Sequence, residues 1–534
     1  MSNTTKKPTG MLVLVVALAV ILIALVILAL NFHLVDFQLY ARNSTQLDLT
    51  QKSITTQHYD KLHTALPECD IHWNVPFQGG TLDSEATVVT VTTLSDEDVE
   101  ILTYLPKLKT VHAENCTDYA QLLTLRQTLP NVQVDYRFRF SGEGYDPDTT
   151  TIFATSATEE EILSLQYLPT LETVVACGND AQTDFSQLQN YCLNSGLEFY
   201  VQAGGQLISC DATDLKVEGI AENEVYLLQY LKDWQKLHLV KPEASAQTVL
   251  DLREQYPEAD ITWEVEIAGE RYDDTTAEVD LSTTVLEDLT PVETAMAYLP
   301  EAETLILGLC GIDNPDWGNS KMDALAESPI ENEDVAAFRD RVQEQYKVVW
   351  TVRLGPHIAL RTDADNFMPN HFGVGRLPDD YAYNLRYCID MVCLDLGHMT
   401  LSQIDFVEYM PKLKYLILAW TNVQYIEPIR SCKNLIFLEL DNSAIRDLAP
   451  LVDCTALEDL NIGNAWPDTS ALLEMPWLKN VYMIFGSRSD AWKISQALPD
   501  TRVVTSGNAT VGGGWRRMQN YYDMRDMLHA PYMN

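Results

Sequence analysis

A short apolar pattern recurs at a fixed spacing in the last third of the chain, and this repeat limits the folds that the chain can adopt. The pattern L-x-x-L-x-L, with other apolar residues at some positions, begins at Leu413, Leu435, Leu457 and Leu478. Successive starts lie 22, 22 and 21 residues apart. Repeats of this length are typical of stacked arrays, in which one unit buries its apolar face only against its neighbours. One short strand and one return segment are therefore expected in every coil.

A longer and more degenerate repeat precedes these coils. An aromatic residue inside an alternating strand recurs after 63, 64 and 63 residues and once more before the short coils: Trp73, Tyr136, Tyr200, Trp263 and Trp350. Helix starts are marked by capping residues such as Ser95 and by a capping box, Thr158 with Glu161. Because the strand frame of the short coils also recurs here, as in Leu108-x-x-Val111, one curved sheet is expected throughout. The predicted fold is an α/β solenoid.

The short coils resemble leucine-rich repeats of the internalin type, found in bacterial surface proteins, as the run LIFLELDNSAIRDLAPL from Leu435 to Leu451 illustrates. The longer modules resemble those of membrane-anchored leucine-rich repeat proteins of Gram-positive bacteria. The usual position of an asparagine ladder instead holds Thr421, Ser443 and Ala465. The resemblance therefore implies a leucine-rich repeat-like array that binds a partner, without a regular ladder of buried amides.

One uninterrupted apolar stretch, Met11 to Leu30, holds no charge, glycine or proline. At roughly 1.5 Å per residue, a helix of that length spans about 30 Å, the thickness of the hydrocarbon core of a bilayer. A cleavable signal peptide usually has an apolar core of only about 7–15 residues, so an uncleaved signal anchor is favoured. Because Lys6 and Lys7 precede the stretch, the positive-inside rule keeps the N-terminus in the cytoplasm. The prediction is a single-pass plasma-membrane protein with an extracellular C-terminal region.

These patterns divide the chain into successive segments. They are a cytoplasmic tail (1–10), a transmembrane signal anchor (11–30), a juxtamembrane segment and N-terminal cap (31–66), degenerate long-period modules with inserted loops (67–388), leucine-rich repeats (389–486) and a C-terminal cap (487–534). The period breaks at 311–334 and 355–388, which are expected to be the inserted loops. A closing helix, Trp515 to Leu528, is expected to cap the array and to form salt bridges with the last coils through its arginines.

Composition narrows the classes of partner. A net charge of −41 and a pI near 4.4 argue against nucleic acid, which demands a positive surface. The acidic residues are spread along the chain, which favours a solvated exterior over a surface that recruits cations or basic proteins. Ten cysteines permit disulfide bonds after export without requiring them. Cys432 and Cys454 occupy the same position in successive coils, where packed thiols are favoured over a bridge between coils.

The candidate binding site is the sheet face of the short coils. In each strand the leucines point inward and the residues between them point outward. With Ile389-x-x-Val392-x-Leu394 taken as the first coil, the predicted binding residues are Met391, Tyr415, Ile417, Trp420, Phe437, Glu439, Asp441, Asp459, Asn461 and Tyr482. Exposed aromatic residues with a polar rim are typical of a protein interface. The alternative is that residues 355–388 fold over this face and bury it.

No catalytic motif, cofactor-binding loop or metal-ligand spacing is present in the sequence. The run Asp363-Ala-Asp365-Asn366 lacks the glycine and the distal glutamate of a calcium loop. Neither catalysis, a cofactor nor a metal is therefore expected. The leading hypothesis is a non-catalytic cell-surface protein that binds an extracellular protein or a cell-wall component. The alternatives are an envelope scaffold that organises membrane complexes and, third, a wall hydrolase.

Overall fold

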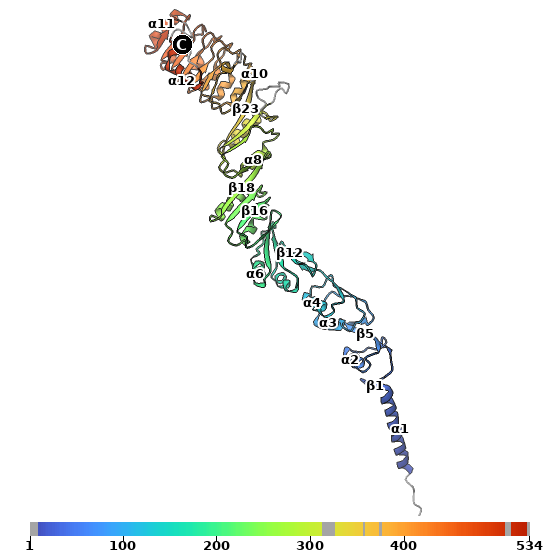
Figure 1. The fold of residues 1–534 in the computed structure, drawn as a ribbon. Helices are drawn as coiled ribbons and strands as arrows, with labels where there is room; N and C mark the ends of the chain where they lie inside the picture. The colour runs from blue at the N-terminus through green and yellow to red at the C-terminus, as the bar shows by residue number, and fades with distance from the viewer. Residues whose placement is uncertain (1–8, 312–325, 356–357, 373–375, 508–513, 531–534) are drawn as a thin grey trace, which may run out of the picture. The chain divides into compact units, whose positions relative to one another are not determined.

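The computed structural model describes residues 9–311, 326–355, 358–372, 376–507 and 514–530. The described chain divides into two compact units, 1–237 with 258–260 and 238–257 with 261–534. Most of the predicted cytoplasmic tail and much of the first predicted loop lie outside the described residues. Figure 1 colours the elements of both units in chain order.

The apolar stretch forms the helix α1 (Thr9–Asn31), blue in Figure 1. Its residues Val13–Asn31 have a mean hydropathy of 3.6, and none of that segment is buried against the rest of the chain. A helix this long and apolar can cross a bilayer, although a signal sequence has the same properties. It is followed by an antiparallel hairpin of β1 (Phe32–Val35) and β2 (Gln38–Ala41).

Each complete long module of unit 1 has three parallel strands joined by helices and then a hairpin. In one module, β7 (Val88–Thr90), β8 (Thr110–His112) and β9 (Gln133–Asp135) alternate with α3 (Asp96–Leu102) and α4 (Tyr119–Thr128), and the hairpin is β10 (Phe138–Phe140) with β11 (Glu143–Tyr145). The next module has β12 (Thr151–Ala154), α5 (Glu159–Ser164), β13 (Thr173–Cys177), α6 (Ser186–Ser195), β14 (Glu198–Ala203) and β15 (Gln206–Ser209). The predicted helix starts are confirmed, because Ser95 and Thr158 both form capping boxes.

The remaining elements before the short coils follow the same plan. Those before the first complete module are β3 (Gln46–Asp48), α2 (Thr56–Ala65), β4 (Asp70–His72), β5 (Asn74–Phe77) and β6 (Gly80–Asp83). Those after β15 are β16 (Asp214–Glu218), η2 (Val225–Tyr230), β17 (Lys236–Val240), α7 (Ala246–Gln255), β18 (Asp260–Ile267), β19 (Glu270–Asp273), β20 (Glu278–Leu281), α8 (Thr290–Met296), β21 (Thr304–Cys310), β22 (Glu327–Ser328), α9 (Asn332–Val342), β23 (Lys347–Gly355) and β24 (Ile358–Arg361).

The expectation of one continuous sheet is wrong for the long modules. Within unit 1 the strands form separate sheets of two to four strands. The cause is the hairpin: β15 pairs antiparallel with β14 and occupies the edge that a strand of the next module would need. In unit 2, β24 closes β23 in the same way.

The three tryptophans among the five recurring aromatic residues are buried anchors of their modules, whereas Tyr200 is only partly buried. Trp73, Trp263 and Trp350 are fully buried. The backbone N–H of each donates to a side-chain oxygen 11 or 12 residues later, namely that of Ser84 (3.0 Å), Asp274 (3.2 Å) and Thr362 (3.1 Å). At these three positions the sequence repeat therefore reflects a repeated contact between a strand and the end of its hairpin.

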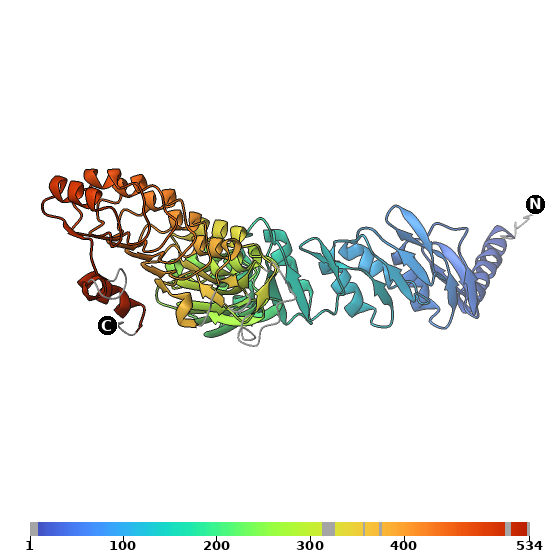
Figure 2. The same ribbon diagram turned by 90° about the horizontal axis from the view of Figure 1, so that it is seen from above.

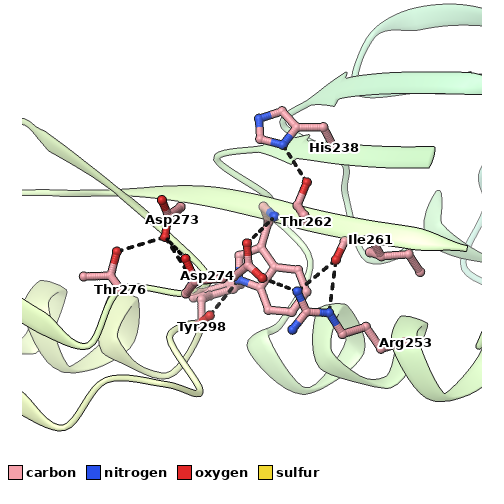
Figure 3. A network of polar contacts seen from close by, with 10 residues as sticks. His238, Arg253, Ile261, Thr262, Asp273, Asp274, Thr276 and Tyr298 are labelled. Atoms are coloured by element: carbon pink, nitrogen blue, oxygen red, sulfur yellow. Dashed lines mark hydrogen bonds and ion pairs between the residues drawn. The ribbon is translucent and has the colours of Figure 1, made fainter.

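The anchor at Trp263 has the polar partners Arg253, Asp274 and Tyr298, which are labelled in Figure 3. The indole Nε1 donates to the carbonyl oxygen of Tyr298 at 2.6 Å. The guanidinium carbon of Arg253 lies 4.1 Å from the ring centroid, and Arg253 also pairs with the buried carboxylate of Asp274. This carboxylate thus joins the strand, the hairpin and the preceding helix α7.

The short coils form one sheet of seven parallel strands. They are β25 (Asn366–Phe367), β26 (Cys393–Asp395), β27 (Tyr415–Ile417), β28 (Phe437–Glu439), β29 (Asp459–Asn461), β30 (Asn480–Tyr482) and β31 (Arg502–Val504). The return segments are η3 (Pro369–Phe372), α10 (Asp379–Ala382), η4 (Tyr383–Tyr387), η5 (Asp405–Tyr409), η6 (Glu427–Ser431), η7 (Ala449–Asp453), η8 (Ser470–Glu474) and α11 (Arg488–Ala497). One strand and one short return per coil confirm the predicted leucine-rich repeat architecture.

Two expected details of the coils have clear outcomes. In place of an amide ladder, Thr421 Oγ1 and Ser443 Oγ each donate to a backbone carbonyl three residues earlier, both at 2.7 Å. Residues 355–388 are not an inserted loop, because they contain β24, β25 and the return segment of the first coil. The period breaks there since a long module gives way to a short coil.

The packed-thiol prediction for the coils is confirmed. All ten cysteines are free, and both Cys432 and Cys454 are buried. The thiol of Cys432 donates to the carbonyl oxygen of Val407 at 3.6 Å, and that of Cys454 to Ile429 at 3.3 Å. Burial raises the pKa of Cys432 to about 11 and that of Cys454 to about 12, so both are protonated at neutral pH.

Candidate binding face of the short coils

The first and third residues of each short strand form two columns on one face of the sheet. The strand register gives Cys393, Tyr415, Phe437, Asp459 and Asn480 as one column and Asp395, Ile417, Glu439, Asn461 and Tyr482 as the other. Met391 was placed on this face wrongly. Because Cys393 pairs with Tyr415, Met391 aligns with Leu413, and both are buried inside the coils. The frame taken from Ile389 was two residues too early.

Most of the predicted site is buried. The side chains of Tyr415, Ile417, Phe437, Glu439, Asp441, Asp459, Asn461 and Tyr482 are at most 7% exposed, whereas Trp420 is 52% exposed. Met368 is the one described residue of 355–388 in the apolar cluster at this face, and because it directly follows strand β25 it belongs to the face itself and not to a cover over it. The main cover is the C-terminal segment, η9 (Trp515–Arg517) and α12 (Gln519–Met527).

The C-terminal segment lies across the sheet face and not beyond the last coil. In Figure 2 the short helical turns lie on one side of the strands and this segment, dark red, on the other. Its side chains Trp515, Tyr521, Met524 and Leu528 form one apolar cluster with residues of the face. The expected closing helix exists, but the last coil is completed by α11 and β31.

Trp515 is the central contact of the segment. Its ring stacks on Phe437, with centroids 4.5 Å apart, and meets Tyr482 edge-on at 5.2 Å. Its indole Nε1 donates to Glu439 Oε2 at 2.7 Å. A buried aromatic side chain with one satisfied polar atom is typical of the energetic centre of a protein interface.

Further polar contacts join the segment to acidic groups of the face. Asn520 Nδ2 donates to Asp459 Oδ2 at 2.7 Å. The guanidinium of Arg525 lies 3.9 Å from the carboxylate of Asp395, and both side chains are largely buried. The segment with its arginines therefore contacts an acidic face, in line with the expected salt bridges. The contacts extend over several coils and are not confined to the last ones.

Burial controls the protonation of these acids. It raises the pKa of Glu439 to about 7, against the lowering effects of the Trp515 hydrogen bond and the Arg516 charge. The second oxygen of Glu439, Oε1, is buried and has no hydrogen-bond partner among the described residues. Burial also raises the pKa of the other carboxyl groups on or beside the face, which are Asp395, Asp441 and Asp459.

The residue three positions after each of the strands β26 to β30 has a left-handed backbone. These residues are His398, Trp420, Asn442, Asn464 and Phe485, with φ between 53° and 65°. The N–H of each of the first four donates to a carbonyl of the next coil, at 2.7 to 3.1 Å. Asparagine tolerates this conformation, whereas a bulky side chain rarely adopts it.

Large aromatic side chains are exposed along this edge of the sheet. Trp420, Phe485 (61% exposed) and Trp466 (62% exposed, φ 53°) form what is called here the aromatic edge. The ring of His398 stacks on Trp420 at 5.7 Å. Trp420 is thus the predicted site residue that remains accessible, while Trp466 and Phe485 were missed.

The sequence held a signal for Phe485, which was missed, and for the C-terminal segment that covers the face. Trp420 and Phe485 stand where neighbouring coils have Asn442 and Asn464, so an aromatic replaces a residue suited to the turn. Trp515 begins a segment rich in arginine in a strongly acidic chain, which signals an acidic docking surface.

The face shows no arrangement for metal binding. Among the described residues, no three or more His, Cys, Asp or Glu side chains gather closely enough to hold a metal ion. In the former calcium-like run, Asp363 instead forms an ion pair with Arg361 at 2.8 Å.

Comparisons with known proteins were made for the whole chain. No protein-family model and no curated protein matches it. Among solved structures, it is similar to an internalin of Listeria monocytogenes (15% identity, 73% of this chain and 88% of that one, TM-score 0.20). It is also similar to a leucine-rich repeat protein of Leptospira interrogans (11% identity, 77% and 93%, TM-score 0.21). Because these TM-scores are low, the architecture of the short coils is assigned from their own strands and register.

Proposed function

We propose that this protein is a non-catalytic binding protein, anchored in the plasma membrane by α1, whose short coils recognise a protein partner outside the membrane. The aromatic edge is the contact surface. The observation that carries this proposal is the exposure of Trp420, Trp466 and Phe485 in left-handed backbone conformations. Such conformations are costly for bulky residues and are concentrated at functional sites.

The chemistry of the edge favours a protein partner. Exposed tryptophan and phenylalanine side chains provide large apolar contact areas, and protein interfaces are enriched in them. The ring of His398 stacks on Trp420 and supplies a polar group beside the apolar surface. The spread of acidic residues excludes nucleic acid as the favoured partner.

The location rests on α1 and on the charges before it. The helix is apolar along its length, with no buried side, and Lys6 and Lys7 precede it. These features support an uncleaved anchor with the C-terminal region extracellular. A partner would then be another surface protein, a secreted protein or a protein of the cell wall.

Photo-crosslinking in intact cells tests the edge. A photoreactive amino acid in place of Trp420 should capture a discrete protein, whereas the same group in place of Trp492, an even more exposed tryptophan on α11, should not. With the captured protein purified, Trp420→Ala should weaken its binding by about tenfold or more, and Trp492→Ala should leave it unchanged.

The outcomes separate the hypotheses. Equal capture from both positions, or unchanged affinity of Trp420→Ala, contradicts the aromatic edge as the contact surface. Partners confined to the same membrane would support an envelope scaffold instead of a receptor. Turnover of wall glycans or peptides by the purified protein would contradict a non-catalytic role.

A further inference from the structure

We propose that the sheet face of the short coils is a groove for an amphipathic helix bearing tryptophan and arginine, and that residues 514–530 are its internal, displaceable ligand. This concerns the covered face and does not depend on the role of the aromatic edge. Side-chain contacts hold the segment on the face, the charges of the two are complementary, and acidic groups are buried beneath the segment.

The segment is attached to the coils through side chains. Within the described residues, the backbone–backbone hydrogen bonds of η9 and α12 join residues of the same segment, as in Arg517 to Gly514 and Leu528 to Met524. The sheet keeps its own ladder from β25 to β31 without them. The segment can therefore leave without breaking a backbone hydrogen bond of the coils.

The contact has the composition of an interface between two proteins. A stacked tryptophan lies at its centre, and Asn520 and Arg525 make polar contacts away from it. The segment carries Arg516, Arg517 and Arg525 against Asp523 and Asp526, an excess of positive charge in a chain with a net charge of −41. The face opposite carries Asp395, Glu439 and Asp459. This complementarity specifies a ligand that is both aromatic and cationic.

The docked state also carries the free-energy cost of burying an unsatisfied carboxylate oxygen, which an apolar core would avoid. Glu439 Oε1 is buried without a hydrogen-bond partner among the described residues. A leucine or methionine there would pack under Trp515 without that cost. An acidic group at the centre of the face is instead suited to a surface that is alternately open and occupied.

Cys393 provides a direct probe of displacement. Its thiol lies on the sheet face, is fully buried, and contacts the carbonyl oxygen of Met524 at 3.8 Å. Cys432 and Cys454 lie inside the coils and become accessible only when the coils themselves open. Alkylation of the full-length protein, read cysteine by cysteine with mass spectrometry, therefore separates undocking from unfolding.

The proposal predicts that Cys393 reacts faster than Cys432 and Cys454 in the unaltered protein. Trp515→Ala should raise the Cys393 rate by about tenfold or more and leave the other two rates unchanged. Asn520→Ala, which removes one hydrogen bond to Asp459, should raise it by a smaller factor. Trp492→Ala, which alters an exposed residue away from the face, serves as the matched control.

A synthetic peptide of residues 514–530 tests the groove itself. Added to the Trp515→Ala protein, it should slow Cys393 alkylation, and the same peptide with Trp515→Ala should not. If Cys393 reacts only together with Cys432 and Cys454 in every variant, the segment is a fixed part of the coils and the proposal is overturned. Failure of the peptide to protect Cys393 in a protein whose segment has undocked overturns it as well. Neither result bears on crosslinking from the aromatic edge.

Discussion

At the scale of single residues, the backbone of Trp420 is the most informative feature of the short coils. Its φ of 60° lies in the left-handed backbone region, which residues other than glycine, asparagine and aspartate rarely adopt. The N–H of Trp420 still bonds the next coil at 2.9 Å, as Asn442 does at the equivalent position. The turn is therefore required by the coil, while the aromatic side chain is not.

This difference leads to a prediction on stability. Trp420→Asn should increase the free energy of unfolding of the coils by about 1 kcal/mol, because asparagine is better suited to the left-handed turn. The reverse substitution at the matched position, Asn442→Trp, should lower it by a similar amount. Denaturant unfolding followed at the coils measures both. A loss of stability in Trp420→Asn would show that the indole supports the fold, and the functional interpretation of its strain would fail.

At the scale of elements, docking of η9 and α12 is coupled to protonation of Glu439. The docked carboxyl has a pKa of about 7, above its ordinary value of 4.5, because it is buried next to Asp395 and Asp441. The docked state therefore binds the proton more tightly than the open state does. Docking is strongest below pH 4.5, weakens as pH rises from 4.5 to about 7, and then levels off because the carboxyl is ionised in both states.

The groups that surround Glu439 set the size of this effect. Arg516 and Trp515 approach it from η9, and Asp395 and Asp441 from the coils. His398, beside the aromatic edge, acts to lower the pKa of Asp395 and Asp441 through its charge, against the larger raising effect of burial. Because several charges act on one site, a neutral substitution is a cleaner test than a change of pH.

Glu439→Gln should hold the segment docked at pH 8. The amide keeps an acceptor for the Trp515 indole and removes the buried negative charge. Since the nine-residue helix α12 is too short to persist alone, its amide hydrogen exchange reports undocking. Exchange in α12 should slow by about tenfold or more relative to the unaltered protein. The exposed Glu474→Gln is the control, and faster exchange in Glu439→Gln would contradict the coupling.

The sequence predicts the elements better than it predicts what covers them. Leucine spacing and capping residues such as Thr158 are local signals, so coils and helix starts were correctly expected. Tyr415 and Phe437 were expected to be exposed, but both are buried. Their burial depends on the segment that begins at Trp515, some 80 to 100 residues later in the chain. Likewise, no local pattern indicates that the hairpin strand β15 interrupts the sheet. Contacts between distant segments are the part that periodicity does not encode.

At the scale of the whole molecule, the role of α1 decides where the binding surfaces operate. An uncleaved anchor predicts that the full chain of 60.2 kDa remains in the membrane fraction and is released by detergent but not by alkaline carbonate. Protease added to intact cells without their wall should digest the short coils. Recovery of a soluble protein that begins after residue 31 would show that α1 is a cleaved signal sequence.

The hairpins that close the long modules affect how this chain can change in evolution. Each such module completes its own sheet, so the backbone bonds within a neighbour do not depend on it. A strand of the short coils, in contrast, is bonded on both sides, as β28 is to β27 and β29. Duplication or deletion of a whole module should therefore disrupt its neighbours little. Loss of one coil, in contrast, forces two strands that were not neighbours to pair with each other. Variation in length among relatives should accordingly be concentrated between α1 and residue 361.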